Sequence, residues 1–327
     1  MVFSGTSISR GGVASQVAAA QAAEEAGYEA VWVAEVQEPD AITVLAAVAS
    51  ATSRITLATG ILPTYVRDPF LMAMTLHSLQ EYSGGRLLPG FGTSTPAIVT
   101  GWHGIPFERP IRHTREYVGL VRRLLAGERV KSEGTFTIRG ASLRSAANPA
   151  MPIWLAGLNP QMLELAGEIA DGVILNFPTV GYVERALEAI DRGLRKSART
   201  RGEFTIAANF RTCITDVFEN GANPLRRELV TYFMAPVYQK VFREDGYEVD
   251  VQRVTQLWAA GERAGAIAAI PDDFVDAHGV IGTLEACRAK VQAFLDLGID
   301  EAILFPVVAD GSGAEAYIGT IRAFGRP

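Results

Sequence analysis

Short apolar runs alternate along this chain with longer segments whose apolar residues recur at helical spacing. The runs Ala30–Ala34 and Gly172–Asn176 are almost wholly apolar, which is typical of parallel strands buried on both faces. Val13–Ala26 and Leu284–Leu297 have the spacing of helices, and each is followed by a glycine, a common helix C-cap. The pattern therefore predicts strands and helices in regular alternation.

Eight strands are expected when Val2–Ser4 is counted as the first. The others are Ala30–Ala34, Ile55–Thr59, Arg86–Phe91, Pro152–Ala156, Gly172–Asn176, Phe204–Thr212 and Ala302–Val307. Eight such units that close on themselves form a (β/α)8 TIM barrel. An open, doubly wound α/β sheet is the weaker alternative, because no G-x-G-x-x-G motif follows the first strand.

Two segments interrupt the alternation, so we expect a single domain over residues 1–327 that carries two insertions. Residues 129–148, which contain TFTIRG, predict a β-hairpin. Residues 219–271 are helical in pattern, with four apolar anchors, Met234, Tyr238, Phe242 and Trp258. The first strand falls short of the usual ~5–6 residues, so either it is short or the chain begins later than its relatives do.

Composition changes this picture mainly by what it excludes. The content of 48% hydrophobic and 20% charged residues is that of an ordinary soluble globule, and no apolar run approaches the ~20 residues that span a bilayer. No signal peptide is visible, and Cys213 and Cys287 lack metal-ligand spacing, so we expect a cytoplasmic protein with no metal site and no membrane partner. A net charge of −6 argues against nucleic acid as a partner.

Loops rich in Gly, Thr and Ser follow two neighbouring strands, at the end of a parallel sheet where such folds bind ligands. Gly60 follows the third strand, either as a turn glycine or as part of a strained Gly60–Ile61 peptide against a planar cofactor. Gly92, Thr93 and Ser94 follow the fourth strand. They form either a tight turn or a loop whose backbone and hydroxyls contact a ligand.

Two titratable residues are candidates for catalysis. Glu35 ends the second strand, where it is either a catalytic or binding carboxylate or a strand-end acid paired with an arginine. His103 lies beside Trp102 beyond the fourth strand, and a lone histidine of this kind is either structural or catalytic.

An anion site is predicted after the fifth strand, where Ala156, Gly157, Leu158 and Asn159 open a helix whose free N–H groups favour phosphate. Asn159 also fits as the helix N-cap before Pro160, and both roles are compatible. A second, basic feature consists of Arg109, Arg112 and Arg115, which form either a local patch for an anionic cofactor tail or solvated arginines at a helix start.

The order of these motifs resembles the bacterial luciferase-like superfamily. The resemblance rests on VWVAE, ITLATGIL, DPFLMAMTLHSLQEYSGGRLLPGFGTS and PIWLAGLNPQMLELAGEIADGVIL. It covers nearly all of residues 13–215 and the terminal GTLEACRAKVQAFLDLGIDEAILFP. Within the superfamily, GWHGIPFERPIRHTREYV is similar to the oxidoreductases that depend on a deazaflavin, coenzyme F-420 (8-hydroxy-5-deazaflavin).

The resemblance implies a role for each candidate. It places a non-prolyl cis peptide at Gly60–Ile61, in a bulge that backs the middle ring of the deazaflavin. It assigns the polyol tail to Gly92, Thr93 and Ser94 and the phosphate to Ala156–Asn159. Glu35 matches the acid near the ring system. Two departures are Val36, where several relatives have His, and Thr95, where sugar-phosphate-oxidising relatives have Glu, so a sugar-phosphate substrate loses support.

The implied activity is hydride transfer between the deazaflavin and a small-molecule substrate, with Glu35 or His103 moving the accompanying proton. We expect a homodimer. An FMN-dependent monooxygenase on the same barrel is the first alternative. The others are a barrel that binds cofactor without turnover and a partner subunit that uses residues 219–271 as its interface.

Overall fold

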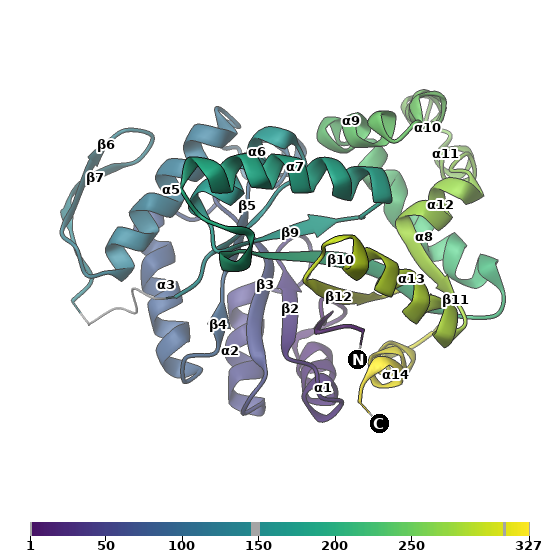
Figure 1. The fold of residues 1–327 in the computed structure, drawn as a ribbon, viewed down its shortest axis with the longest axis horizontal. Helices are drawn as coiled ribbons and strands as arrows, with labels where there is room; N and C mark the ends of the chain where they lie inside the picture. Colours follow the sequence, from purple (N-terminus) through teal and green to yellow (C-terminus); the bar gives the residue numbers. More distant parts are fainter. Residues whose placement is uncertain (1, 145–150, 310–311, 327) are drawn as a thin grey trace.

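Eight parallel strands close into a barrel inside a ring of helices (Figure 1), as the sequence predicts. The computed structural model describes residues 2–144, 151–309 and 312–326. The barrel order is β1 (Gly5–Ser7), β2 (Ala30–Ala34), β3 (Thr56–Pro63), β5 (Gly90–Gly92), β8 (Trp154–Ala156), β9 (Gly172–Asn176), β10 (Thr205–Ile214) and β12 (Glu301–Pro306). The short β4 (Leu87–Leu88) pairs with β3, and β11 (Gly279–Gly282) pairs with the end of β10.

The first strand lies three residues later than predicted. Gly5 pairs with Ile303 and with Ala30, so β1 closes the barrel between β12 and β2. Of the predicted strand Val2–Ser4, only Ser4 joins the neighbouring segments, donating to the Ala302 carbonyl at 3.1 Å and accepting from the Glu29 N–H at 2.8 Å. Phe3 is wholly buried, with its ring 5.0 Å from that of Phe324, so its packing anchors the N-terminal residues.

Five of the eight surrounding helices begin at side-chain caps that the sequence provides. The eight are α1 (Val13–Glu25), α2 (Ala41–Ala51), α3 (Pro69–Tyr82), α5 (Pro110–Leu125), α6 (Pro160–Ile169), α7 (Val180–Lys196), α13 (Leu284–Leu297) and α14 (Ala314–Phe324). The capped helices are α2, α3, α6, α7 and α13. Asp68 accepts hydrogen bonds from the N–H groups of Phe70 and Leu71, and Pro69 takes the first helical position. No described helix is long and apolar enough to cross a membrane.

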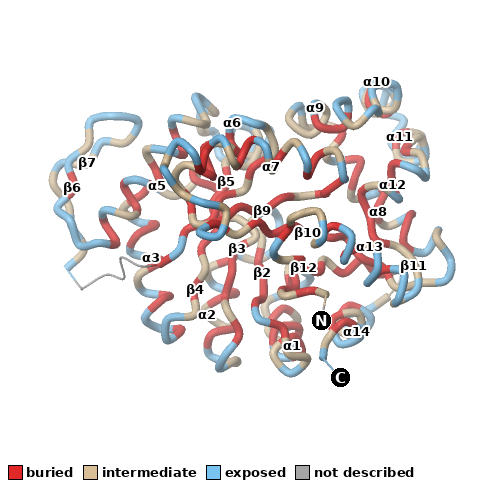
Figure 2. The backbone as a smooth tube through the Cα atoms, in the orientation of Figure 1, coloured by how far each residue is buried: buried red, intermediate tan, exposed pale blue. Residues whose placement is uncertain are grey.

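Both predicted insertions are present. The hairpin consists of β6 (Val130–Glu133) and β7 (Thr137–Ala141), and residues 145–148 of its predicted range lie outside the described residues. The helical insertion comprises α8 (Phe218–Phe233), α9 (Pro236–Glu244), α10 (Glu248–Ala259), α11 (Arg263–Ala268) and α12 (Asp272–His278). It has its own apolar core, in which Phe242 is buried while Met234, Tyr238 and Trp258 pack at its edge. Figure 2 shows buried residues along the barrel strands and the inner faces of the helices.

The barrel interior is packed solid below the predicted site. Trp32 and Trp154 meet with ring centroids 5.5 Å apart, surrounded by small and aliphatic side chains. A Cβ atom on Gly172 would lie 2.6 Å from the Trp154 ring, so the absence of a side chain there makes room for the indole. Because this layer fills the lumen, chemistry is confined to the carboxyl ends of the strands.

Glu301, at the opposite end of β12, makes stability depend on pH. Burial, with the nearby charges of Glu29 and Asp300, raises its pKa from 4.5 to about 7. Between these two pH values the folded state keeps a proton on Glu301 that the unfolded state has lost. The contribution of Glu301 to the free energy of unfolding is therefore fully present below pH 4.5 and is lost as the pH rises to about 7. Urea unfolding at pH 5 and at pH 8 measures how far the free energy of unfolding falls between these two pH values. We expect this fall to be about 1–2 kcal/mol smaller in Glu301→Gln than in wild type. An unchanged pH dependence would contradict this assignment.

Candidate functional site

The predicted bulge after the third strand is present, but its peptide is not cis. Val33 pairs with Thr59 and Ala34 pairs with Ile61, so Gly60 is an extra residue on β3. The described residues contain no cis peptide bond, and the cis Gly60–Ile61 prediction is therefore wrong for this structure. The shift in pairing register between β2 and β3 accommodates the extra residue, so the Gly60–Ile61 peptide can be trans.

Three neighbouring strands bring predicted cofactor residues together. An ideal Cβ atom on Gly92 would lie 2.9 Å from Cδ1 of Ile61 and 3.5 Å from Cβ of Ala156. Gly92 and Ala156 are the last residues of β5 and β8, and Ile61 lies two residues before the end of β3. Ser94 follows with a φ of 58°, a left-handed conformation that turns the loop sharply toward α4 (Pro96–Val99).

The turn after β8 is a helix start, as predicted. Asn159 accepts a hydrogen bond of 2.9 Å from the N–H of Met162, and Pro160 is the first residue of α6. The Gly157 carbonyl accepts a 2.8 Å bond from the Tyr182 hydroxyl, which fixes the turn against α7. Leu158 lies between these two anchored residues. The N-terminal end of the α6 dipole favours an anion at this position.

Glu35 is paired with an arginine and also has an unpaired oxygen. Its Oε1 binds Arg67, which also reaches Asp40 at 2.5 Å, and Oε2 is buried without a partner among the described residues. Burial opposes the charge on Arg67, but the two carboxylates outweigh it and raise the arginine pKa. The N–H of Glu35 donates to the Ile61 carbonyl at 3.2 Å, so the acid is fixed to the bulge.

The structure does not bring His103 to Glu35. His103 and Trp102 lie in an exposed turn after α4. The histidine that is buried nearby is His113, which the sequence analysis did not single out. Its ring stacks on Tyr65 at 3.7 Å, its Nε2 lies 3.1 Å from the Thr64 carbonyl, and burial lowers its pKa. The sequence signal that could have identified His113 was its position on the apolar face of α5.

The predicted basic patch is largely neutralised. Arg112 bonds Glu116 at 2.6 Å, and Arg115 makes a two-pronged contact of 2.5 and 2.7 Å with Glu168. Arg109 precedes α5 with a φ of 46°. Since two of the three charges are paired with carboxylates of the chain, this part of the surface is poorly suited to a cofactor tail.

A buried arginine at the same end of the barrel was also missed. Arg211 lies in β10 with its side chain 4% exposed, and it contacts Asn176, Glu228 and Tyr232. The signal in the sequence was a charged residue inside the apolar run FTIAANFRT. Arg211 is four residues after Ala207, so the two side chains point to the same face of the strand.

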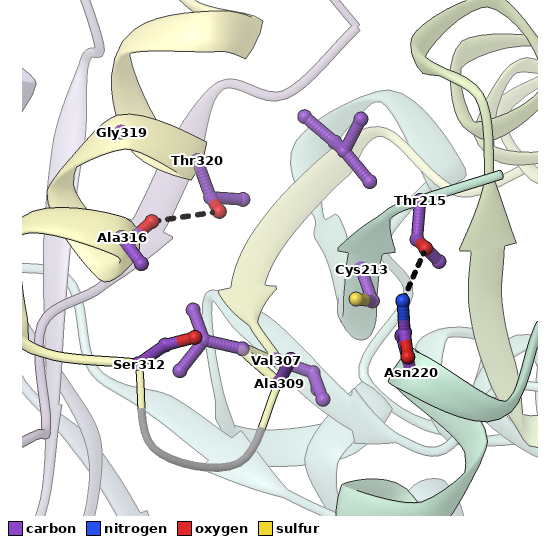
Figure 3. A pocket seen from close by; sticks show the side chains of 11 residues that line it. Cys213, Thr215, Asn220, Val307, Ala309, Ser312, Ala316, Gly319 and Thr320 are labelled. Carbon is purple, nitrogen blue, oxygen red and sulfur yellow. Dashed lines mark hydrogen bonds between the residues drawn. The ribbon is translucent and has the colours of Figure 1, made fainter. Parts of the chain in front are cut away.

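A hollow of about 360 Å³ lies beyond the ends of β10 and β12, beside α8 and α14 (Figure 3). Two of its hydroxyls are already engaged, since Thr320 donates to the Ala316 carbonyl and Thr215 accepts from Asn220. Burial raises the pKa of the Cys213 thiol, which is free, so it is a poor nucleophile. None of the predicted site residues lines this hollow.

Comparisons with known proteins show which family and fold the chain resembles. The family model described as luciferase-like monooxygenase matches residues 2–301. A Mycobacterium tuberculosis protein named as a coenzyme F-420-dependent oxidoreductase is 31% identical over 301 residues, covering 85% of this chain and 86% of that protein. The 5,10-methylenetetrahydromethanopterin reductase of Methanolobus tindarius is 29% identical, covering 87% of each. The structure of the coenzyme F-420-dependent tetrahydromethanopterin reductase from Methanopyrus kandleri superposes with a TM-score of 0.85 at 22% identity, covering 98% and 97%.

Proposed function

Because the chain belongs to the luciferase-like monooxygenase family, we propose that it is an oxidoreductase that transfers a hydride between coenzyme F-420 and a small organic substrate. Two of its relatives are named for F-420-dependent oxidoreduction or for reduction of a methylene-pterin. The observation that carries the proposal is the meeting of Ile61, Gly92 and Ala156 beside the start of α6.

The residues at this end of the barrel fit the cofactor. Gly92 lets the Ile61 side chain pack against the end of β5, since a Cβ atom there would lie 2.9 Å from Cδ1 of Ile61, and the adjacent helix start is suited to a phosphate. We assign the ring system to Gly60 and Ile61, with the polyol at Gly92, Thr93 and Ser94 and the phosphate at Ala156, Gly157, Leu158 and Asn159. When bound, the deazaflavin supplies the carbon that carries the hydride.

Glu35 is our candidate for the proton-transfer group. Its unpaired Oε2 is the atom that would accept or release the proton, while Arg67 holds Oε1 and keeps the carboxylate oriented. The solid layer around Trp32 and Trp154 closes the site from below and excludes water from that side.

Turnover can be tested without knowing the natural substrate. The purified protein is mixed anaerobically with reduced deazaflavin and a panel of enones and imines, and with oxidised deazaflavin and a panel of alcohols. We expect the visible absorbance of the cofactor to change with at least one panel. A protein that binds the cofactor but exchanges no hydride with any member of the panels would instead be a non-catalytic member of the family.

An FMN-dependent monooxygenase is the second candidate, favoured by the description of the matching family model. A deazaflavin reacts poorly with oxygen, whereas a reduced flavin reacts readily. Oxygen consumption with reduced FMN and no consumption of reduced F-420 would support this candidate over the first.

We further propose that the protein is a cytoplasmic homodimer. Leu71, Met74 and Tyr82 of α3 are 47%, 45% and 63% exposed, an unusual density of large apolar groups on one helix. The free, buried thiols of Cys213 and Cys287 suit a reducing compartment. Sedimentation should give a dimer for wild type and a monomer for the variant carrying both Leu71→Glu and Met74→Glu. A monomeric wild type would contradict the dimer.

A further inference from the structure

The carboxyl end of the barrel contains a polar cluster that the cofactor assignment does not use. Ala207, Ile174 and Ile303 belong to the apolar cluster inside the barrel. Side chains alternate between the two faces of a strand, so residues an even number of positions further on point into the barrel as well. These residues are Arg211 on β10, Asn176 on β9 and Phe305 on β12. The helical insertion contributes the remaining members, Glu228 and Tyr232 of α8 and Tyr238 of α9.

Each nitrogen of the Arg211 guanidinium has a hydrogen-bond partner within the protein. Its Nε donates to Glu228 at 2.9 Å, one Nη donates to the Asn176 amide oxygen, and the other reaches the Tyr232 hydroxyl at 3.4 Å. Its central carbon lies 4.1 Å from the ring centroids of both Phe177 and Phe305. The charge is balanced by Glu228 and both faces are covered, so the guanidinium has little left to offer an anionic substrate.

The tyrosines, in contrast, retain donor capacity. The Tyr238 hydroxyl accepts a 2.8 Å bond from the Asn176 amide, and the Tyr232 hydroxyl accepts from Arg211, so each can still donate its own proton. The two rings meet edge to face at 4.7 Å, and both side chains are half-buried. Burial raises the pKa of Tyr238, so its hydroxyl stays protonated.

Phe177 supports the same arrangement through its backbone. It follows β9 directly with a φ of 53°, a conformation that a bulky residue rarely adopts without support from its surroundings. Its ring contacts Tyr232 at 4.7 Å and the face of Arg211 at 4.1 Å.

We propose that Tyr232 and Tyr238 form the substrate-recognition edge of the site and that Arg211 is the positioning residue that holds them. The enzyme then selects a neutral, planar substrate that carries a hydrogen-bond acceptor, such as a carbonyl or imine attached to a flat apolar group. This inference rests on the proposed function. Two donating hydroxyls on aromatic rings suit such a group, whereas the internally balanced pair of Arg211 and Glu228 gives no attraction to a carboxylate or phosphate.

Three probes of similar shape test the proposal: benzaldehyde, toluene and benzoate, each titrated into the protein with oxidised F-420 bound. We expect benzaldehyde to bind at least about tenfold more tightly than toluene, and benzoate to bind most weakly. Tyr232→Phe and Tyr238→Phe should each lower benzaldehyde affinity by up to about tenfold, leaving toluene and F-420 affinity unchanged. Arg211→Lys should lower the ratio of benzaldehyde affinity to toluene affinity. Adding Tyr238→Phe to this variant should lower the ratio little further.

This ratio shows whether Arg211 positions the tyrosines or has only a general structural role, because loosened packing would weaken the binding of both probes alike. Benzoate binding as tightly as benzaldehyde, benzaldehyde binding no better than toluene, or tyrosine variants that behave like wild type would each overturn the proposal. If Arg211→Lys does not fold, the two tyrosine variants decide. Absence of F-420 binding by wild type would refute the proposed function instead, and the probes would then be titrated into the cofactor-free protein.

Discussion

Replacing Glu35 with Gln should lower kcat by about 100- to 10,000-fold, the range expected on loss of a general acid or base. The amide keeps the shape of the carboxylate but cannot take up or release a proton at the position of Oε2, which has no partner among the described residues. The Glu35 N–H to Ile61 bond of 3.2 Å involves only the backbone and is retained. Steady-state kinetics should show the loss in kcat, while titration shows an unchanged affinity for F-420.

Asp40→Asn is the matched control, since Asp40 is the second carboxylate on Arg67. It is more exposed than Glu35, and its main contact is a 2.7 Å bond from the Thr43 N–H at the start of α2. Asparagine preserves that cap, so kcat should stay within about threefold of wild type. Equal losses in the two variants would mean that the Arg67 pairs are structural and that another group transfers the proton.

Substitution of Gly92 by Leu should weaken F-420 binding by at least about 100-fold. The new side chain would occupy the space between Ile61 and Ala156, where even a Cβ atom would lie 2.9 Å from the Ile61 methyl group. Equilibrium titration with oxidised F-420 measures the effect, and thermal unfolding shows whether the barrel remains intact.

Gly92→Ala serves as the graded control. Its methyl group meets the far end of a flexible Ile61 side chain, which can shift by a few tenths of an ångström. We therefore expect a smaller loss of affinity in a folded protein. Wild-type affinity in Gly92→Leu would show that the cofactor does not lie against this strand end, and the site would have to be moved.

Most of the barrel could be predicted because its strands and helices have distinct periodicities and end at glycines or caps. The predicted bounds of β2 and α13 are those observed. The first strand was misplaced by three residues because so short a segment carries too little pattern to fix its register. The C-terminal helix α14 was not predicted.

The site was predictable only where its residues are adjacent in sequence. The Gly92–Ser94 loop and the capped turn at Asn159 follow from local rules of backbone geometry. The cluster around Arg211 unites residues from three strands and two helices of the insertion, and no local sequence pattern predicts that they lie together. His103 was singled out for its neighbours in sequence, although tertiary packing buries His113 instead. The family prediction is confirmed by the match over residues 2–301.

Cofactor choice is the most direct test of this account. Wild-type protein is titrated separately with F-420 and with FMN, and the two dissociation constants are compared under identical conditions. We expect the dissociation constant of F-420 to be at least about 100-fold lower than that of FMN, a difference of roughly 2.7 kcal/mol in binding free energy. Equal affinities, or tighter binding of FMN, would contradict it.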